Sequence, residues 1–404
     1  MHQSTERGKR QVSRRAVLQG GGLAGVSAFL AACSTGGSAT AAPGASGEPG
    51  ATETGELKFA NWDAYIDLTE VGDGEYDLPS PTLDEFQQEY GVEVTYANAE
   101  IEDNESFMAT IRPQLEAGVE TGWDLIVLTD WMASKVVGAG WAEEISPENT
   151  QTAAANVRDE LRGLPWDPDM KFHYPWQSGA TGVGYNVAST GRDLTTWADL
   201  FDPAFAGKVT LLSDARDFFP LMHLMLQAQG KASDTPSEEM TADDAQVVFD
   251  YAKPFVDNGH VRAFTGNEYL QDFGSGDTWA AMVWSGDLAS SGGEDDRFQY
   301  PEEGSNIWTD NMIIPKGAVN KLNAERMIDW VYDVDRAARL AAFIYYISPV
   351  KGVAEAIVEL DAGAAENPLL FPPPEVVAKQ HPQPDWDEET EAAINDLFAE
   401  LTGV

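Results

Sequence analysis

Residues Trp123–Gly140, WDLIVLTDWMASKVVGAG, show the chain's clearest structural pattern. The apolar run WDLIVLT predicts a buried strand, and DWMASKVVGAG continues it as a helix that ends at a glycine. A buried strand that leads directly into a helix is the repeating unit of α/β folds. This stretch therefore predicts an α/β fold.

The same alternation precedes this stretch. Residues 57–60, LKFA, predict a strand, and residues 82–91, TLDEFQQEYG, predict a helix with Thr82 as its N-cap. Residues 92–96, VEVTY, alternate as a half-buried strand, and residues 105–118 predict a second helix.

A second series of strands and helices follows it. Strands are expected at 179–186, 208–212 and 279–286, and helices at 195–200, 217–229, 241–258, 323–334 and 335–347. The apolar segment 307–315 precedes the last two helices. The chain contains no internal repeat. The part of the chain that we expect to fold begins near Glu56 and comprises about 350 residues, which is long enough for two domains.

The N-terminal residues indicate export and lipid attachment. Residues 1–32 combine the adjacent Arg14 and Arg15 with a short apolar stretch, which is typical of a twin-arginine export signal. Leu30–Cys33, LAAC, resembles a lipoprotein cleavage site, and Cys33 is the only cysteine. Residues 33–55 are rich in Gly, Ala, Ser, Pro and Thr, so we expect a flexible tether.

The composition is strongly acidic. The full chain carries 67 Asp and Glu against 25 Lys and Arg, a formal net charge of −42. Such a surface repels nucleic acid and anionic lipid, and it concentrates cations. A salty habitat or a demand for solubility would produce the same acidity, so the charge alone does not identify a ligand.

Tryptophan and aspartate recur together where predicted strands end. The pattern appears in Asn61–Asp63, NWD, in Trp284–Asp287, WSGD, and in Trp308–Asp310, WTD. Ligands of open α/β sheets bind beyond the carboxyl ends of strands. We therefore expect Trp62, Trp284 and Trp308 at a cleft, although a tryptophan that packs a helix on the sheet would give the same pattern.

Several longer segments resemble one known family, the spermidine/putrescine substrate-binding proteins of ATP-driven uptake transporters. The resemblance extends from about Glu56 to Val350 and is carried by LKFANWDAY (57–65), GWDLIVLTDWMASKVVGAGW (122–141), PWQSGATGVGYN (175–186), TTWADLFDPAFAGKVTLLSDARD (195–217), AAMVWSGD (280–287) and IWTDNMIIPKGA (307–318).

This resemblance implies an α/β, two-lobed periplasmic-binding-protein fold of type II, whose chain crosses between lobes twice, near Ser178 and Trp308. Lobe 1 would comprise residues 56–178 and 309–351, and lobe 2 residues 179–308 and 352–404. It also implies a lipid-anchored extracytoplasmic monomer that delivers a polyamine or another small organic cation to an ABC permease and its ATPase. No catalytic residue, metal or cofactor is expected.

The family's ligand contacts fall on eleven positions of this chain: Trp62, Asp63, Tyr65, Thr129, Trp131, Asp214, Asp217, Trp284, Trp308, Asp310 and Tyr346. The chain departs from spermidine binders in carrying Asp217 for Glu, Asp63 for Thr and Trp131 for Tyr. A family glutamine near the C-terminus would correspond to Asp387.

These residue types suit a polyamine. Ammonium groups lose hydration on burial unless carboxylates receive them, and methylene chains need apolar walls that ring faces provide. Two of the acids also have a structural interpretation: Ser213 or Asp214 can cap the helix that follows KVTLL, with Asp217 in its first turn. Asp130 and Asp287 are expected as outer acids or turn residues, and Tyr345 could replace Tyr346.

Three other functions remain open. Carboxylates with aromatic platforms also make glycoside hydrolases, but HExxH and GxSxG motifs are absent from the sequence. Residues 72–77, GDGEYD, give Asp73, Glu75 and Asp77 the first spacings of a calcium loop, but Leu78 stands where an EF-hand has glycine. A neutral sugar would also fit the rings.

Overall fold

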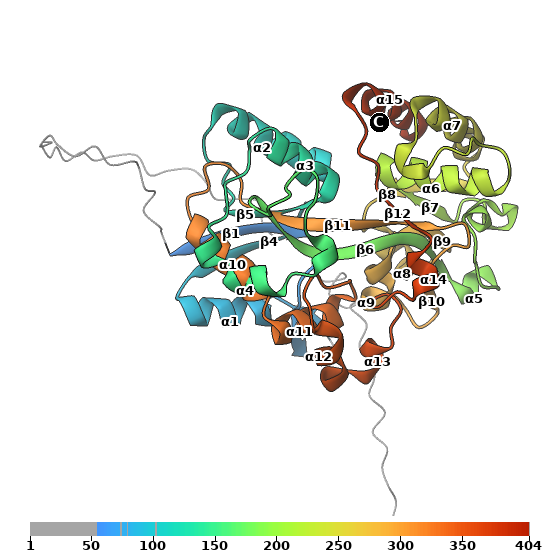
Figure 1. Cartoon of the computed structure of the whole chain (residues 1–404). Coiled ribbons are helices and arrows are strands. Elements are labelled where there is room, and N and C mark those ends of the chain that lie inside the picture. Colours follow the sequence, from blue (N-terminus) through green and yellow to red (C-terminus); the bar gives the residue numbers. More distant parts are fainter. Residues whose placement is uncertain (1–54, 73–74, 79, 102, 404) are drawn as a thin grey trace, which may run out of the picture.

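The computed structural model describes residues 55–72, 75–78, 80–101 and 103–403 (Figure 1). The export signal, Cys33, nearly all of the tether and Asp73 lie outside these residues. Among the described residues, none of the helices is long and apolar enough to cross a membrane.

One mixed sheet runs through the body in the order β4-β1-β5-β11-β6-β9-β7-β8, with β10 paired to β6 and β12 to β11. Its strands are β1 (Glu56–Trp62), β4 (Glu93–Ile101), β5 (Leu125–Thr129), β6 (His173–Asn186), β7 (Val209–Leu212), β8 (Val261–Thr265), β9 (Ala280–Trp284), β10 (Asp296–Gln299), β11 (Ser305–Ile313) and β12 (Gln380–Pro382). A separate hairpin joins β2 (Thr69–Gly72) to β3 (Glu75–Asp77).

The antiparallel pair β6 and β11 connects two parallel groups of strands. On one side, Asp310–Ile313 pair with β5, which is parallel to β1. On the other side, residues 181–185 of β6 pair with β9, which is parallel to β7. The predicted crossovers lie in the middle of this pair, where Trp308 is opposite Gly179 and Thr309 is opposite Ser178.

The first lobe consists of the β4-β1-β5 side of the sheet with helices on both faces. Alternate residues of β5 face opposite ways: Leu125 and Val127 join one core cluster, and Ile126 and Leu128 join another. The helices are α1 (Pro81–Tyr90), α2 (Asn104–Ala117), α3 (Asp130–Gly138), α4 (Gln151–Asn156), α10 (Lys321–Val331) and α11 (Val334–Ile344). In Figure 1, α2 and α3 lie above the sheet and α1 and α11 below it.

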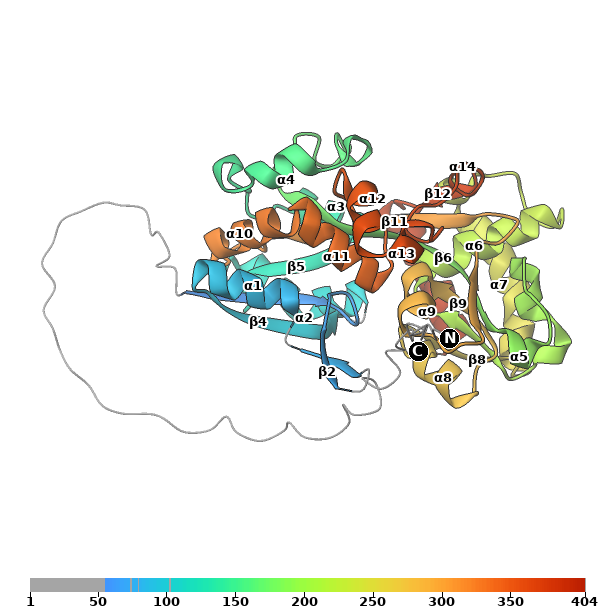
Figure 2. The same cartoon turned by 90° about the horizontal axis from the view of Figure 1, so that it is seen from below.

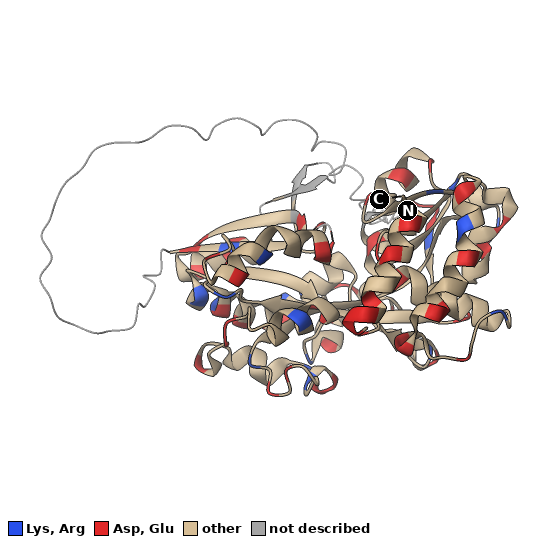
Figure 3. Ribbon diagram, turned by 90° about the horizontal axis from the view of Figure 1, so that it is seen from above, with Lys and Arg blue, Asp and Glu red and all other residues tan. Residues whose placement is uncertain are grey.

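The second lobe surrounds β9, β7 and β8. Its helices are α5 (Val187–Thr190), α6 (Ala215–Ala228), α7 (Ala242–Asp257), α8 (Tyr269–Ser275), α9 (Ser285–Ser291), α14 (Pro374–Val377) and α15 (Glu388–Thr402). Almost every residue of α6 is buried, so this helix forms the centre of the second core. Acidic residues outnumber basic ones along the ribbon of both lobes (Figure 3).

Local boundaries differ from the predicted ones in two places. Ser80, not Thr82, is the N-cap of α1, because Pro81 occupies the first helical position and the Leu83 amide donates to Ser80 Oγ. The helix predicted for 335–347 ends at Ile344, where Tyr345 adopts a left-handed φ of 60°.

The C-terminal tail corrects the predicted lobe boundary. Helices α12 (Val353–Leu360) and α13 (Ala362–Ala365) belong to the first lobe rather than the second, because Val353, Ile357 and Ala364 pack in its core. Figure 2 shows α12 beside α11. The tail reaches the second lobe only after Phe371, where β12 and α15 join it, so the chain crosses between lobes three times. Long-range packing decides this path, and local sequence patterns do not record it.

Candidate functional site

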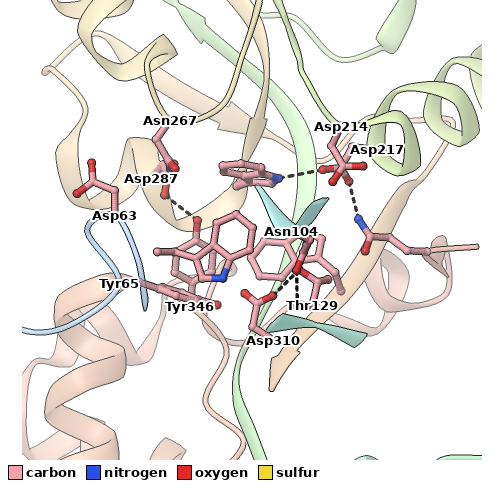
Figure 4. A pocket seen from close by; sticks show the side chains of 14 residues that line it. Asp63, Tyr65, Asn104, Thr129, Asp214, Asp217, Asn267, Asp287, Asp310 and Tyr346 are labelled. Atoms are coloured by element: carbon pink, nitrogen blue, oxygen red, sulfur yellow. Dashed lines mark hydrogen bonds between the residues drawn. The ribbon is translucent and has the colours of Figure 1, made fainter. Parts of the chain in front are cut away.

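A pocket lies between the two lobes, at the ends of several strands (Figure 4). Side chains from both lobes and from the tail line it: Trp62, Asp63, Tyr65, Asn104, Thr129, Asp214, Asp217, Asn267, Trp284, Asp287, Trp308, Asp310, Tyr346 and Gln383.

Aromatic rings form the walls of the pocket. Trp62 and Trp284 meet edge to face with ring centroids 6.3 Å apart, and Trp62 Nε1 donates to the Val127 carbonyl. Tyr346 packs against Trp308 at 5.5 Å and against Tyr65 at 5.1 Å. The walls therefore come from both lobes, because Trp284 belongs to the second lobe and the other rings to the first lobe or to the crossing strand β11.

Two glycines make room for these rings. A Cβ at Gly179 would lie 2.6 Å from the Trp308 ring, and one at Gly286 would lie 2.5 Å from the Tyr346 ring. Any side chain at either position would displace a ring. The conformation of the pocket wall therefore depends on the absence of two Cβ atoms.

The carboxylates are held by hydrogen bonds from neighbouring side chains. Asp217, 1% exposed, accepts from Trp284 Nε1 at 3.0 Å, Thr181 Oγ1 at 2.9 Å and Gln383 Nε2 at 3.0 Å, and also from Asn306. Asp310, 4% exposed, accepts from Thr129 Oγ1 at 2.8 Å.

Two further acids lie elsewhere in the pocket. Asp287, 4% exposed, accepts from the hydroxyls of Tyr346 at 2.7 Å and Tyr269 at 2.5 Å, and from Asn267 Nδ2 at 2.7 Å. Asp63 is half-buried and accepts from Asn98 Nδ2 at 2.8 Å.

Burial raises the pKa values of four of the pocket acids. The pKa of Asp214 rises to about 7 through burial and the nearby Asp217, and burial raises that of Asp310 to about 7. Burial also raises the pKa values of Asp217 and Asp287, against the effect of their hydrogen-bond donors. Of the described residues that line the pocket, none is a lysine, arginine or histidine. The site is therefore prepared for positive charge.

The structure brings ten of the eleven predicted residues into this pocket. Trp131 is the exception: it packs in the first-lobe core under the Arg216 guanidinium, whose Cζ lies 3.7 Å from the ring centroid. Its indole does not line the pocket, because a cation from the other lobe covers it. Tyr346, rather than Tyr345, faces the pocket. Whether the ten residues bind ligand stays a prediction.

The two acids near the start of α6 differ in role. Asp214 caps the helix by accepting from the Arg216 amide at 2.7 Å, and it also lines the pocket, so the two interpretations are compatible. Asp217 lies in the first turn, but its carboxylate points toward Trp284 and Gln383. Asp130 lies outside the pocket and accepts from Asn311 at 2.7 Å.

Sequence reasoning missed three lining residues, namely Asn104, Asn267 and Gln383, and it placed Asp287 only in an outer layer. Gln383 replaces the expected Asp387, which instead caps α15 by accepting from the Thr390 amide. The recurrence of tryptophan and aspartate at strand ends, here Trp-Ser-Gly-Asp, could have identified Asp287. Gln383 lies in an irregular tail segment and carries no such pattern.

The described residues contain no cluster of histidine, cysteine, aspartate and glutamate that could hold a metal ion. Asp73 of the calcium loop that the sequence suggests lies outside the described residues.

A two-lobed α/β protein with a pocket between its lobes has the architecture of a solute-binding protein. The model of the bacterial extracellular solute-binding protein family matches residues 82–372, and the chain belongs to that family.

Three similar proteins illustrate the relationship. The spermidine/putrescine-binding periplasmic protein 1 of Haemophilus influenzae is 29% identical over 311 residues, covering 76% of this chain and 81% of its own. The Escherichia coli K12 spermidine/putrescine-binding periplasmic protein is 26% identical over 346 residues, covering 85% and 89%. A solved structure described as a putative spermidine/putrescine ABC transporter from Listeria monocytogenes superposes with a TM-score of 0.72 at 24% identity, covering 86% of this chain and 99% of that one.

These comparisons confirm the two-lobed fold of type II and the solute-binding role. They also favour a carrier over a hydrolase, because the family's members bind solutes and are not enzymes.

Proposed function

We propose that this chain is an extracytoplasmic lipoprotein that captures a polyamine, putrescine or spermidine, between its lobes and delivers it to an ABC importer. The observation that carries the proposal is the charge of the pocket: Asp63, Asp214, Asp217, Asp287 and Asp310 line it without a basic residue.

The acids are distributed as a ligand with separated positive charges requires. Figure 4 shows Asp63 and Asp287 on one side of the aromatic residues and Asp214 and Asp217 on the other. An ammonium group at each end would meet carboxylates, and the methylene chain between them would lie against the rings. Each charge-assisted hydrogen bond contributes roughly 1.5–3 kcal/mol. A neutral sugar would leave these buried acids without counter-ions.

One lining atom supports the same ligand. Gln383 Oε1 is buried and has no hydrogen-bond partner among the described residues. This oxygen accepts hydrogen bonds only, so an ammonium group is a suitable partner.

Calorimetric titration of the mature protein tests the ligand. Putrescine and spermidine should bind, whereas 4-aminobutanol, with one nitrogen replaced by a hydroxyl, should bind much more weakly and a disaccharide not at all. Equal affinity for putrescine and 4-aminobutanol would contradict recognition of two separated ammonium groups by the pocket. Binding of the disaccharide alone would replace the proposal by a sugar carrier.

The lipoprotein part rests on Leu30–Cys33 and on the single cysteine. Cys33→Ser removes the atom that a lipid would modify, so we expect the exported protein in the medium rather than with the membrane. Fractionation followed by immunoblotting measures this distribution. A variant that stays as firmly attached as the parent would contradict lipid attachment at Cys33.

A further inference from the structure

A second group of charged and aromatic residues spans the lobes outside the ligand pocket. It contains Trp131 and Lys135 on α3 of the first lobe, Arg216 on α6 of the second lobe, and Trp386 and Glu391 of the tail. We call this group the interlobe clamp. None of its residues lines the ligand pocket.

Arg216 is the centre of the clamp. The side chain is only 2% exposed, although it is a guanidinium. Its Cζ lies 3.7 Å from the Trp131 ring centroid and 4.8 Å from that of Trp386, so the group is enclosed by a ring from each lobe. Nη2 donates to Glu391 Oε1 at 2.6 Å, and Nε donates to the Pro384 carbonyl at 3.3 Å. Buried arginine is rare unless such partners replace water.

Glu391 receives a second cation from the opposite lobe. Lys135 Nζ donates to the same carboxylate and lies 5.1 Å from the Trp131 centroid. Burial alone would raise the pKa of Glu391, but the hydrogen bonds from Lys135 and Arg216 outweigh it and lower the pKa. Two positive groups thus share one carboxylate, and one of them belongs to the first lobe.

The clamp and the pocket meet in the first turn of α6. Asp214, which lines the pocket, accepts from the Arg216 amide, and Asp217 accepts from Gln383 of the tail. Arg216 then bonds to Pro384, the next residue of that tail. The turn that presents two carboxylates to the pocket is therefore the turn that presents Arg216 to Trp131.

We propose that the interlobe clamp holds the closed form and thereby sets how long a bound ligand is retained, without touching that ligand. This inference rests on the proposed function, because it assumes that the lobes open to release ligand. The clamp contacts can form only when α3 approaches α6 and α15. They favour the closed state over the open one, and this preference raises the apparent affinity for any ligand that binds the closed state.

The clamp also gives Trp131 a role as a positioning residue. Its indole offers a larger face to a guanidinium than a phenol does, and tryptophan is the best partner for a cation above its ring. In this structure the residue therefore acts on closure rather than on ligand.

Lys135→Met is the decisive variant, because it removes the ion pair that crosses between lobes, leaves the contact of Arg216 with Trp131 in place and keeps an aliphatic side chain over Trp131. Lys171→Met is the matched control, since Lys171 is a more exposed lysine on the same lobe and its removal changes the net charge equally. Stopped-flow dissociation of putrescine and small-angle X-ray scattering of the ligand-free mature protein are the two measurements.

We expect Lys135→Met to release putrescine about tenfold faster, with an association rate within about twofold of the parent. The ligand-free variant should also have a larger radius of gyration. Lys171→Met should match the parent in both. If the two lysine variants behave alike, the clamp does not hold the closed form.

A double-mutant cycle keeps the inference testable if one variant folds poorly. The Lys135→Met effect should largely disappear when Glu391→Gln is already present, because the two residues form one contact. Independent, multiplying effects would overturn the pairing. A parent that binds neither polyamine would defeat the proposed function, while the ligand-free scattering comparison would still decide the clamp.

Discussion

The ligand pocket contains buried carboxylates and the interlobe clamp contains a partly buried one, and the two groups differ in charge balance. In the clamp, Glu391 has Arg216 and Lys135 as partners, and its pKa is lowered. In the pocket, Asp214 and Asp310 have hydrogen-bond donors but form no ion pair among the described residues, and burial raises their pKa values to about 7, although the nearby Arg216 acts to lower that of Asp214. Burial raises the pKa in both groups, but in the clamp the hydrogen bonds from Lys135 and Arg216 outweigh it.

This difference separates two uses of buried charge. A compensated carboxylate fixes the position of neighbouring elements, because removing any partner leaves an unpaired charge. An uncompensated carboxylate makes the empty site unfavourable and favours whatever cation enters it. The pocket therefore has negative charge that a cationic ligand can neutralise, whereas the carboxylate of the clamp is already paired with cations.

The largest expected effect comes from deleting a charge in the pocket. Asp310→Asn keeps the shape and hydrogen-bonding capacity of the side chain but removes the anion, so putrescine binding at pH 8 should weaken by roughly 1.5–4 kcal/mol. Calorimetry of Asp310→Asn, with thermal melting as a check on folding, gives this value.

Glu388→Gln provides the control for that experiment. Glu388 is exposed on the first turn of α15, and its replacement changes the net charge as much as Asp310→Asn does. Exposed charges are screened by salt, so binding should change little. If Asp310→Asn binds putrescine as tightly as the parent does, Asp310 does not contribute to recognition of the ligand's positive charge.

The next effect concerns pH. The ammonium groups of the ligand stay protonated below pH 9, whereas Asp214 and Asp310 lose their protons near pH 7 in the empty pocket. Affinity should therefore fall as the pH decreases from 8 to 5, by up to about tenfold per unit for each carboxylate that must release a proton. Calorimetry in buffers of different ionisation heat should show proton release on binding at pH 6. Constant affinity across this range would contradict uncompensated acids.

The same acids predict the pH dependence of the empty protein. A carboxyl group whose pKa is higher in the folded state stabilises folding below its unfolded pKa, and this stabilisation is lost as the pH rises through the folded value. For Asp310 the window runs from 3.8 to about 7. The melting temperature of Asp310→Asn should therefore decrease less than that of the parent between pH 5 and pH 8.

The smallest effect should come from one hydrogen bond. Trp284→Phe keeps an aromatic wall but removes the Nε1 donor that lies 3.0 Å from Asp217. Binding should weaken by about 1 kcal/mol, and closure of the lobes should not change, because Trp284 is outside the clamp. Titration and scattering of this variant measure both. A loss of closure comparable to that of Lys135→Met would mean that pocket and clamp are not separable.

The sequence predicts local features of this molecule better than long-range ones. Buried strands such as Leu125–Thr129 and the strand-end tryptophans follow from periodicity, which depends on neighbouring residues. Ten of the eleven ligand-site residues also line the pocket, because the resemblance transfers whole motifs.

The failures concern contacts between distant segments. The indole of Trp131 is directed by Arg216, which lies 85 positions later in the sequence and in the other lobe. The return path of the tail depends on how Val353 and Ile357 pack in the first-lobe core. Gln383 enters the pocket only because that path brings it there. None of these partners can be inferred from residues near the position itself.

The path of the tail separates the residues that build the cores from those that complete the two interlobe sites. Gln383 lines the pocket and Glu391 belongs to the clamp. Of the described residues 380–403, only Trp386, Ile394 and Leu401 belong to the buried cluster of the second core. A variant truncated before residue 380 should therefore keep most of both cores while lacking one lining residue of the pocket and the central carboxylate of the clamp. Completeness of the fold and completeness of these sites thus depend on different segments.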